Sequence, residues 1–291
     1  MRTEAEMMEL ILGFARKDKR VRAVWMNGSR ANPNAKRDQW QDFDIVFAVT
    51  EMGSFLADDS WLDIFGERVI MQSSREQLDQ YDADGNLNFE DWFIAMMQFA
   101  DGNRIDLSLV PLESAAEKIL SDKMCRLLLD KDGILPNVPP STDEDYRVKL
   151  PTELEFRCCV NEVRWVAPYV AKGIWRKEIP YAQEMLGVVR EQVVRMLGWE
   201  ITLEQGKPVN IGKCGKYLED FLPADQYRQF LEGYAGGTLE QIRKSLFVLY
   251  DLFALVSGKV AEKLGFRLDR HEEEKVRQFL QSEEKSDCKF S

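Results

Sequence analysis

Two polar-ended apolar runs, VRAVWMNGS at residues 21–29 and DFDIVFAV at residues 42–49, decide how the first half of this chain folds. Both runs are rich in the β-branched and aromatic residues that favour strands. The first run ends in Asn27-Gly28-Ser29, a turn signal, and the second begins with two aspartates one residue apart. The sequence therefore predicts a strand that ends in a glycine turn, followed by a strand that opens with paired acids.

The spacing of the acids predicts where their side chains point. Side chains at positions i and i+2 of a strand lie on one face, roughly 7 Å apart along the chain. Asp42 and Asp44 therefore share a face, while Phe43 faces the core. A third predicted strand, residues 104–110, places Asp106 inside the same kind of apolar alternation. These three acids are candidates for one shared site.

Electrostatics indicate what such a site binds. Two carboxylates about 6 Å apart repel by roughly 2.5–3 kcal/mol at an effective dielectric near 20, so an ionised cluster needs cations or solvent. Mg²⁺ prefers oxygen ligands and commonly sits on one or two carboxylates together with substrate phosphates. Two such ions stabilise both the attacking and the leaving oxygens of a phosphoryl displacement. Gly28 lets backbone N–H groups approach a phosphate, Ser29 adds a hydroxyl donor, and Arg30 adds a fork-shaped cation.

Outward from this segment, the first 135 residues mix strands and helices. Thr3 and Glu6 form a capping box ahead of a helical apolar repeat, and residues 69–72 predict another strand. The stretch from 92 to 100 fits a helix or a strand equally well. Residues 113–130 are predicted to be helical. We expect an N-terminal mixed sheet with helices in residues 1–135.

The second half has a different character. A proline-rich linker is predicted at residues 136–151, and strand signals almost vanish beyond it. Helical periodicity runs through residues 153–171, 180–197, 224–234 and 239–264, and a charged helix follows from about residue 270. The fold class is therefore α+β, with an all-helical C-terminal bundle, residues 152–291, as the substrate-binding domain.

The amino-acid composition indicates which classes of partner the chain can bind. The chain of 291 residues carries 50 acidic against 39 basic residues, a net charge of −11. This balance argues against nucleic acid as a partner and favours a cationic ligand. Five cysteines without a CxxC pair suit a reducing compartment, and neither a signal peptide nor a membrane-length apolar run is recognisable. We expect a soluble, cytoplasmic protein; the oligomeric state is open, and a monomer is compatible with the sequence.

A family resemblance extends collinearly over about residues 1–265. The chain resembles the aminoglycoside 6-adenylyltransferases, the streptomycin-modifying enzymes within the polymerase-β-like nucleotidyltransferase superfamily. The stretches that carry the resemblance are residues 28–30, 41–45, 61–68, 105–109 and 127–132 in the first half, and 161–162, 169–173, 176–179 and 212–213 in the second. The resemblance implies an N-terminal nucleotidyltransferase domain and transfer of AMP from ATP to a streptomycin hydroxyl, the 6-OH, with release of pyrophosphate and a requirement for Mg²⁺, two ions with ATP.

Roles for individual residues follow as hypotheses. Asp42, Asp44 and Asp106 hold Mg²⁺ as catalytic residues, and Asp106 also helps to deprotonate the acceptor hydroxyl. A second set binds the triphosphate, and a third contacts the cationic acceptor. The nucleotide-binding set is Gly28, Ser29, Arg30 and Lys213, and the acceptor-binding set is Glu162, Glu178, Trp92, Trp165 and Trp175. Core packing is the alternative reading for each tryptophan, and a solvated surface for Lys213 and both glutamates.

The chain departs from the family pattern in two places, so other functions stay open. Asn27 stands where family members carry an acid before Gly-Ser. Arg157-Cys158-Cys159-Val160-Asn161-Glu162 stands where they tend to read Asp-Asp-Cys-Cys-Asn-Glu, so two acids are lost. One alternative is a nucleotidyltransferase that acts on another hydroxyl, such as a lincosamide or a protein side chain. The other is a nucleotide-binding module without turnover. The three acids argue against the second alternative.

Overall fold

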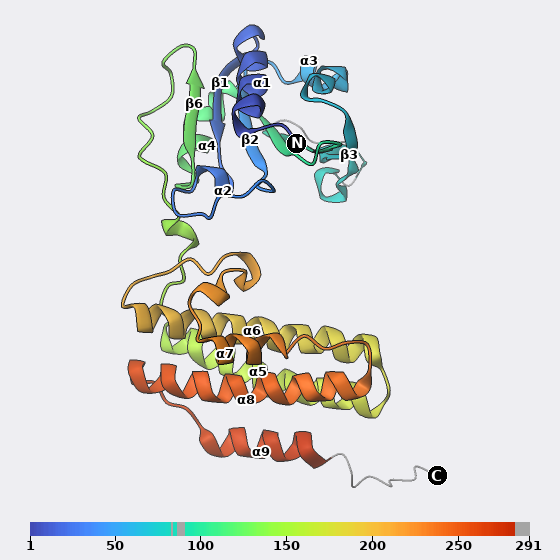
Figure 1. The fold of residues 1–291 in the computed structure, drawn as a ribbon, viewed down its shortest axis with the longest axis vertical. Coiled ribbons are helices and arrows are strands. Elements are labelled where there is room, and N and C mark those ends of the chain that lie inside the picture. Colours follow the sequence, from blue (N-terminus) through green and yellow to red (C-terminus); the bar gives the residue numbers. More distant parts are fainter. Residues whose placement is uncertain (83, 86–90, 283–291) are drawn as a thin grey trace. The chain divides into compact units, whose positions relative to one another are not determined.

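The computed structural model describes residues 1–82, 84–85 and 91–282. It divides the chain into two compact units, Met1–Asp145 and Tyr146–Ser291 (Figure 1). The first unit contains the sheet, and the described part of the second is helical. The predicted fold class, a mixed sheet with helices followed by helices alone, is confirmed.

The sheet of the first unit has six strands in the described residues. Across the sheet they are β3 (Arg68–Ser73), β4 (Phe93–Phe99), β5 (Arg104–Pro111), β2 (Phe43–Val49), β1 (Val21–Met26) and β6 (Arg126–Asp130). The central strands β2 and β5 pair in parallel, and the other neighbours pair antiparallel. Because β2 and β5 run in parallel, both strands begin at the same end of the sheet.

Helices cover the two faces of this sheet. The helix α1 (Glu4–Lys17) begins at the predicted capping box, in which the Thr3 hydroxyl accepts from the Glu6 backbone N–H and the Glu6 carboxylate accepts from Thr3. Its buried residues pack with Phe43 and other side chains of one face. The helix α4 (Ala115–Leu120) packs on the opposite face. Short elements complete the unit: α2 (Gly28–Ala31), α3 (Gly53–Leu56) and 3₁₀ turns at Asp59–Phe65, Ser74–Glu76, Leu78–Gln80, Leu112–Ser114 and Glu144–Tyr146.

One predicted helix is wrong in its second half. Residues 113–130 do not form one helix, because α4 ends at Leu120 and residues 126–130 form the edge strand β6. The Asp122 carboxylate accepts from the Met124 backbone N–H at 2.8 Å, a local turn that competes with the helix. β6 then pairs antiparallel with β1, about a hundred residues earlier in the chain. Long-range pairing therefore overrides a leucine run that suits either structure.

The other strand predictions agree with the structure. Residues 21–26 and 43–49 are strands with the predicted bounds, and residues 69–72 lie inside β3. The stretch from 92 to 100, which fitted a helix or a strand, forms β4, with alternate residues buried between β3 and β5. The apolar alternation around Asp106 is likewise confirmed as β5.

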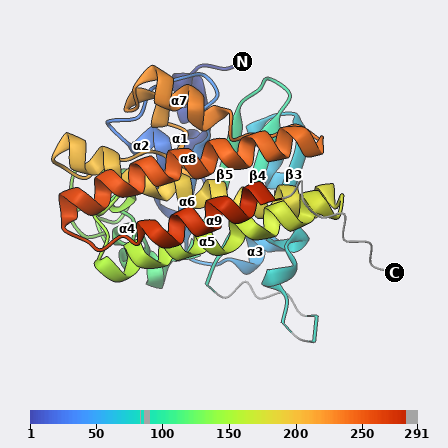
Figure 2. The ribbon, with the colours of Figure 1, turned by 90° about the horizontal axis from the view of Figure 1, so that it is seen from below.

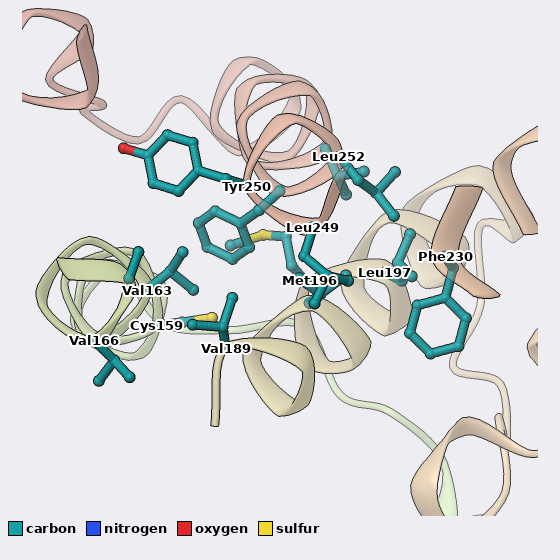
Figure 3. Close-up of a cluster of buried hydrophobic side chains, with 14 of the residues drawn as sticks. Cys159, Val163, Val166, Val189, Met196, Leu197, Phe230, Leu249, Tyr250 and Leu252 are labelled. Carbon is teal, nitrogen blue, oxygen red and sulfur yellow. The ribbon is translucent and has the colours of Figure 1, made fainter. Parts of the chain in front are cut away.

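The second unit is built from helices around one apolar core. They are α5 (Glu153–Trp175), α6 (Ile179–Gln205), α7 (Ala224–Leu231), α8 (Leu239–Leu264) and α9 (Arg270–Gln281), with 3₁₀ turns at Lys213–Gly215 and Leu218–Asp220. Figure 2 shows the long helices lying alongside one another. Figure 3 shows where they meet: Val163 of α5, Met196 of α6 and Leu249 of α8 point into a shared core. Each predicted helix of this half is confirmed.

Two further observations bear on the sequence analysis. Among the residues that the structure describes, helices long and apolar enough to cross a membrane are absent. Cys125, Cys158, Cys159 and Cys214 carry free thiols, and Cys288 lies outside the described residues.

Candidate active site

The candidate site lies where the two parallel strands begin. Asp44 of β2 stands in register with Asp106 of β5. Asp42 directly precedes β2 and shares the i, i+2 face with Asp44. Phe43 and Ile45, between and beyond them, are fully buried in the core on the α1 side, as the sequence predicts. The acids therefore occupy the opposite face, at one end of the central strand pair.

Gly28 brings the turn after β1 against the Asp44 carboxylate. The Asn27 backbone N–H donates to the Asp44 carbonyl at 2.9 Å, which joins the end of β1 to the start of β2. Gly28 has φ of +71°, and a Cβ at this position would lie 2.0 Å from Asp44 Oδ2. A side chain at residue 28 would therefore collide with the candidate ligand as well as strain the backbone. Ser29, the next residue, is half-buried in the short helix α2.

The electrostatic state of the acids agrees with a shared site. Burial raises the pKa of Asp44 to about 6, and repulsion from Asp106 and Asp42 adds to the shift. Burial also raises the pKa of Asp42, which the nearby Arg104 partly opposes. Within the described residues the Asp44 side chain has no hydrogen-bond or ion-pair partner. An unpaired, partly buried carboxylate of this kind is characteristic of a functional site.

Arg104 is a member of the site that the sequence reasoning missed. Its Nε and Nη2 atoms donate to the two oxygens of Asp106 at 2.7 and 2.8 Å, and its Nε lies 3.7 Å from Asp42 Oδ2. The signal was present in the sequence, because Arg104 and Asp106 are i and i+2 on a predicted strand and so share a face.

Arg30 is placed differently from its neighbours Gly28 and Ser29. Its guanidinium is buried, lies 3.9 Å from the centre of the Phe43 ring, and donates to Glu4 Oε2 at 3.0 Å and to the Gln41 carbonyl at 2.7 Å. Burial lowers the pKa of this guanidinium. Arg30 therefore ties together α1, the glycine turn and the segment that leads into β2.

The remaining candidates of the sequence analysis are spread over the two units. Trp92 is half-buried against the apolar cluster beside α4. On α5, Trp165 is 63% exposed and Glu162 is half-buried, one helical turn apart. Trp175, at the end of α5, packs against Phe279 of α9 with ring centres 5.3 Å apart. Glu178 precedes α6 and Lys213 opens a 3₁₀ turn, and both are exposed.

The donor chemistry of the acid cluster fits a hard divalent cation. Asp42, Asp44 and Asp106 supply oxygen ligands only, the type that Mg²⁺ prefers, and the Asp44 carboxylate occupies the place that a side chain at residue 28 would take. Buried polar atoms without a hydrogen-bond partner in the described residues include Asn27 Oδ1, next to this turn. No three acidic, histidine or cysteine side chains of the described residues converge on one point as they stand. At Asp106 the reason is visible, since its two oxygens face Arg104.

The chain is similar to known proteins over nearly its whole length. The family model described as streptomycin adenylyltransferase matches residues 1–283. The chain is 39% identical over 274 residues to an aminoglycoside 6-adenylyltransferase of Campylobacter jejuni, covering 94% of this chain and 93% of the relative. It is 36% identical over 276 residues to that of Bacillus subtilis (strain 168), covering 94% and 95%.

Other similar proteins carry the same description. The aminoglycoside 6-adenylyltransferase of Staphylococcus aureus is 31% identical over 263 residues, covering 90% of this chain and 92% of the relative. A crystal structure of an aminoglycoside 6-adenyltransferase from Bacillus subtilis aligns over 98% of this chain and all of that chain, with 31% identity and a TM-score of 0.47. The identities in sequence extend over both units, so they concern the whole chain.

Proposed function

Because the chain belongs to the streptomycin adenylyltransferase family, we propose that it is an enzyme that transfers AMP from ATP to a hydroxyl of streptomycin. The hydroxyl is the 6-OH and the second product is pyrophosphate. The observation that carries the proposal is the pairing of Asp44 with Asp106 on parallel strands, with the Gly28 turn directly against the Asp44 carboxylate. A phosphate-binding turn beside paired carboxylates is what nucleotidyl transfer with a divalent cation requires.

In this proposal the acids act as a metal-holding set. Asp42 and Asp44 hold Mg²⁺, two ions with ATP, and Asp106 completes the set. When bound, Mg²⁺ would supply positive charge that offsets the negative charge of the triphosphate. Asp106 also accepts the proton of the attacking hydroxyl. The unpaired carboxylate of Asp44 supports this assignment, since a carboxylate held by a structural partner would be less available.

The turn after β1 binds the triphosphate through Gly28 and Ser29. Gly28 allows a close approach of the backbone, and the Ser29 hydroxyl is a hydrogen-bond donor at the start of α2. Arg30 serves the triphosphate by holding this turn, because its guanidinium is engaged by Glu4, the Gln41 carbonyl and the Phe43 ring. We propose that Lys213, exposed in the helical unit, contributes a cation to the leaving pyrophosphate.

The helical unit is proposed to bind the cationic acceptor. Trp165 presents a mostly exposed ring on α5 with Glu162 one turn away, a combination suited to a guanidinium or sugar. Glu178 is an exposed carboxylate before α6. Trp175 packs against the apolar core of this unit, and Trp92 packs against the cluster beside α4 in the first unit, so each acts through packing. ATP as the donor also agrees with the cytoplasmic location that the sequence predicts.

The test is pyrophosphate release from Mg-ATP with streptomycin, compared with a panel of other hydroxylated antibiotics. The matched pair of variants is Asp44→Asn, at the site, and Asp132→Asn, which removes a carboxylate that pairs with Arg22 elsewhere in the same unit. We expect release with streptomycin, a loss of at least about a thousandfold in D44N, and near-normal turnover in D132N.

Other outcomes have definite meanings. Mass spectrometry and NMR of the product identify the adenylylated hydroxyl, and a product other than the 6-adenylyl ester would overturn the regiochemistry. Release with a different acceptor alone would replace streptomycin as the substrate. Protection from unfolding by ATP without pyrophosphate release from any acceptor would favour a binding module. Full turnover in D44N would remove Asp44 from the metal site.

A further inference from the structure

The guanidinium of Arg104 lies where two of the three candidate metal ligands face each other. It donates through two nitrogens to both oxygens of Asp106, and its Nε lies 3.7 Å from Asp42 Oδ2. A bidentate pair of this kind is the strongest form of arginine–carboxylate contact, and it occupies both carboxylate oxygens at once. Arg104 therefore sits within contact of Asp42 and Asp106, the region that a cation shared by these two acids would occupy.

The ion pair with Arg104 reduces the repulsion between the acids, but it also engages the oxygens of Asp106 that a metal ion would bind. Asp44 stands in register with Asp106 and has no partner of its own among the described residues. Without Arg104, three carboxylates would repel one another at this edge of the sheet. Arg104 partly neutralises this cluster of acids and engages both oxygens of Asp106. The side chain of Arg104 is 38% exposed, so it has solvent beside it into which it can withdraw.

We infer that Arg104 is a resting counter-ion of Asp106 that competes with the divalent cation for this carboxylate. In the free enzyme it holds Asp106 in place; for Asp106 to ligate a metal, the guanidinium must release it. Arg104 is thus a positioning residue that acts through Asp106. The inference rests on the proposed function in one respect, namely that the acids hold a divalent cation.

A second arginine–aspartate pair in the same unit provides a matched control. Arg22 of β1 donates through Nε to Asp132 at 2.6 Å, and its Nη2 contacts the other oxygen of the same carboxylate. This pair has the same two-point geometry but lies at the opposite end of β1 from Gly28. Arg22 stands near the start of β1, and Asp132 follows β6. Removing Arg22 therefore tests the loss of such a pair without touching the acid cluster.

The experiment measures Mn²⁺ binding to the full-length free protein, without ATP or acceptor, from the free Mn²⁺ signal in electron paramagnetic resonance. We expect Arg104→Gln to bind Mn²⁺ about tenfold more tightly than wild type, because a competing cation has been removed. Arg104→Lys keeps the charge and should stay within about threefold of wild type. Arg22→Gln should leave the affinity unchanged. In EDTA, R104Q should unfold at a lower temperature than wild type, because the acids lose their counter-ion.

A double-mutant cycle separates competition from a general effect of charge. Arg104→Gln/Asp106→Asn should bind Mn²⁺ no more tightly than Asp106→Asn alone, because Asp106 is the group that Arg104 releases. A folded R104Q, with the circular dichroism of wild type, that binds Mn²⁺ no more tightly would overturn the inference, and so would a gain that survives Asp106→Asn. Mn²⁺ binding requires no transfer, so the inference can fail while adenylylation of streptomycin persists, or stand if the acceptor proves different.

Discussion

The two ends of one sheet face carry opposite chemistry. Where β2 and β5 begin, the face away from α1 displays Asp42, Asp44 and Asp106. Further along the same face, Val46 and Val110 are buried beneath α4 together with other apolar residues. The backbone is the same parallel pair at both ends, and the alternation of side chains is unbroken.

The difference between these ends shows how one strand pair is divided between stability and function. At the covered end, the burial of each apolar side chain stabilises the folded protein. At the other end, the carboxylates lose stability through burial and mutual repulsion, which the raised pKa of Asp44 reflects. Such a cost is expected where a site awaits a charged ligand. Substitutions at each end test this division between stability and function.

The largest effect is expected from Gly28→Ala. The new Cβ would lie 2.0 Å from Asp44 Oδ2 and would also face the strain of φ +71°, so the turn and the carboxylate must move apart. We expect a fall of at least about a hundredfold in pyrophosphate release with Mg-ATP and streptomycin, since a displacement of about 1 Å can cost that much. The assay is the steady-state rate at saturating substrates.

Gly133→Ala is the control for backbone strain alone. Gly133 has φ of +63° in the same unit, but a Cβ there would meet no atom within 4 Å. It should lose about 1–2 kcal/mol of stability and keep its turnover. Equal losses of turnover in G28A and G133A would show that strain, and not contact with Asp44, makes glycine necessary at residue 28.

A smaller effect, of opposite sign to the usual one, is expected for the stability of Asp44→Asn in EDTA. The pKa of Asp44 is raised from 3.8 to about 6 in the folded protein, so the folded state binds more protons than the unfolded chain between these values. The contribution of Asp44 to the stability of the wild type is therefore greatest below about pH 4 and is lost as the pH rises through 6. Asparagine removes this loss, so D44N should be more stable at pH 7 by roughly 1–3 kcal/mol.

Val110→Ala tests the covered end of the same face. Val110 is 2% exposed in the cluster beneath α4, and its truncation should cost roughly 1–3 kcal/mol at every pH. Thermal unfolding followed by circular dichroism from pH 4 to 8 compares the two variants with wild type. This interpretation is wrong if D44N is less stable than wild type at pH 7. It is also wrong if the difference in stability between D44N and wild type is as large at pH 4 as at pH 7.

The smallest effect is expected from Trp165→Ala in the helical unit. The ring is 63% exposed, so its loss should change stability by less than about 0.5 kcal/mol. If it stacks on the guanidinium groups of streptomycin, KM should rise about fivefold with little change in kcat. Trp175→Ala, which removes packing against Phe279, should instead lower the unfolding temperature. An unchanged KM in W165A would exclude Trp165 from the acceptor site.

Much of the α/β unit could be predicted because its signals are local. The strand that ends at Met26, the glycine turn and the strand that opens at Phe43 follow from composition and from a period of two. That Asp42 and Asp44 share a face needs only strand geometry. The helices of the second unit follow in the same way from caps and a helical period, as at the Thr152 capping box.

Other features depended on partners distant in the sequence. Residues 126–130 contain a leucine run that suits a helix or a strand, and pairing with β1 made it a strand. Residues 93–99 became a strand because β3 and β5 flank them. The direction of the Arg30 side chain, toward Glu4 and the Phe43 ring, could not be read from its position after Gly28-Ser29.

Local patterns predicted most of the elements, the face that the paired acids share and the family resemblance, because periodicity, turn chemistry and motif spacing are properties of residues close together in the chain. Long-range strand pairing placed Asp44 in register with Asp106 and brought Gly28 against the Asp44 carboxylate. The register of Asp44 with Asp106 arises because strands separated by about sixty residues pair in parallel, and the contact of Gly28 with Asp44 arises from the antiparallel pairing of β1 with β2. Their energy comes from burial and from charges brought together by folding, which no local pattern encodes.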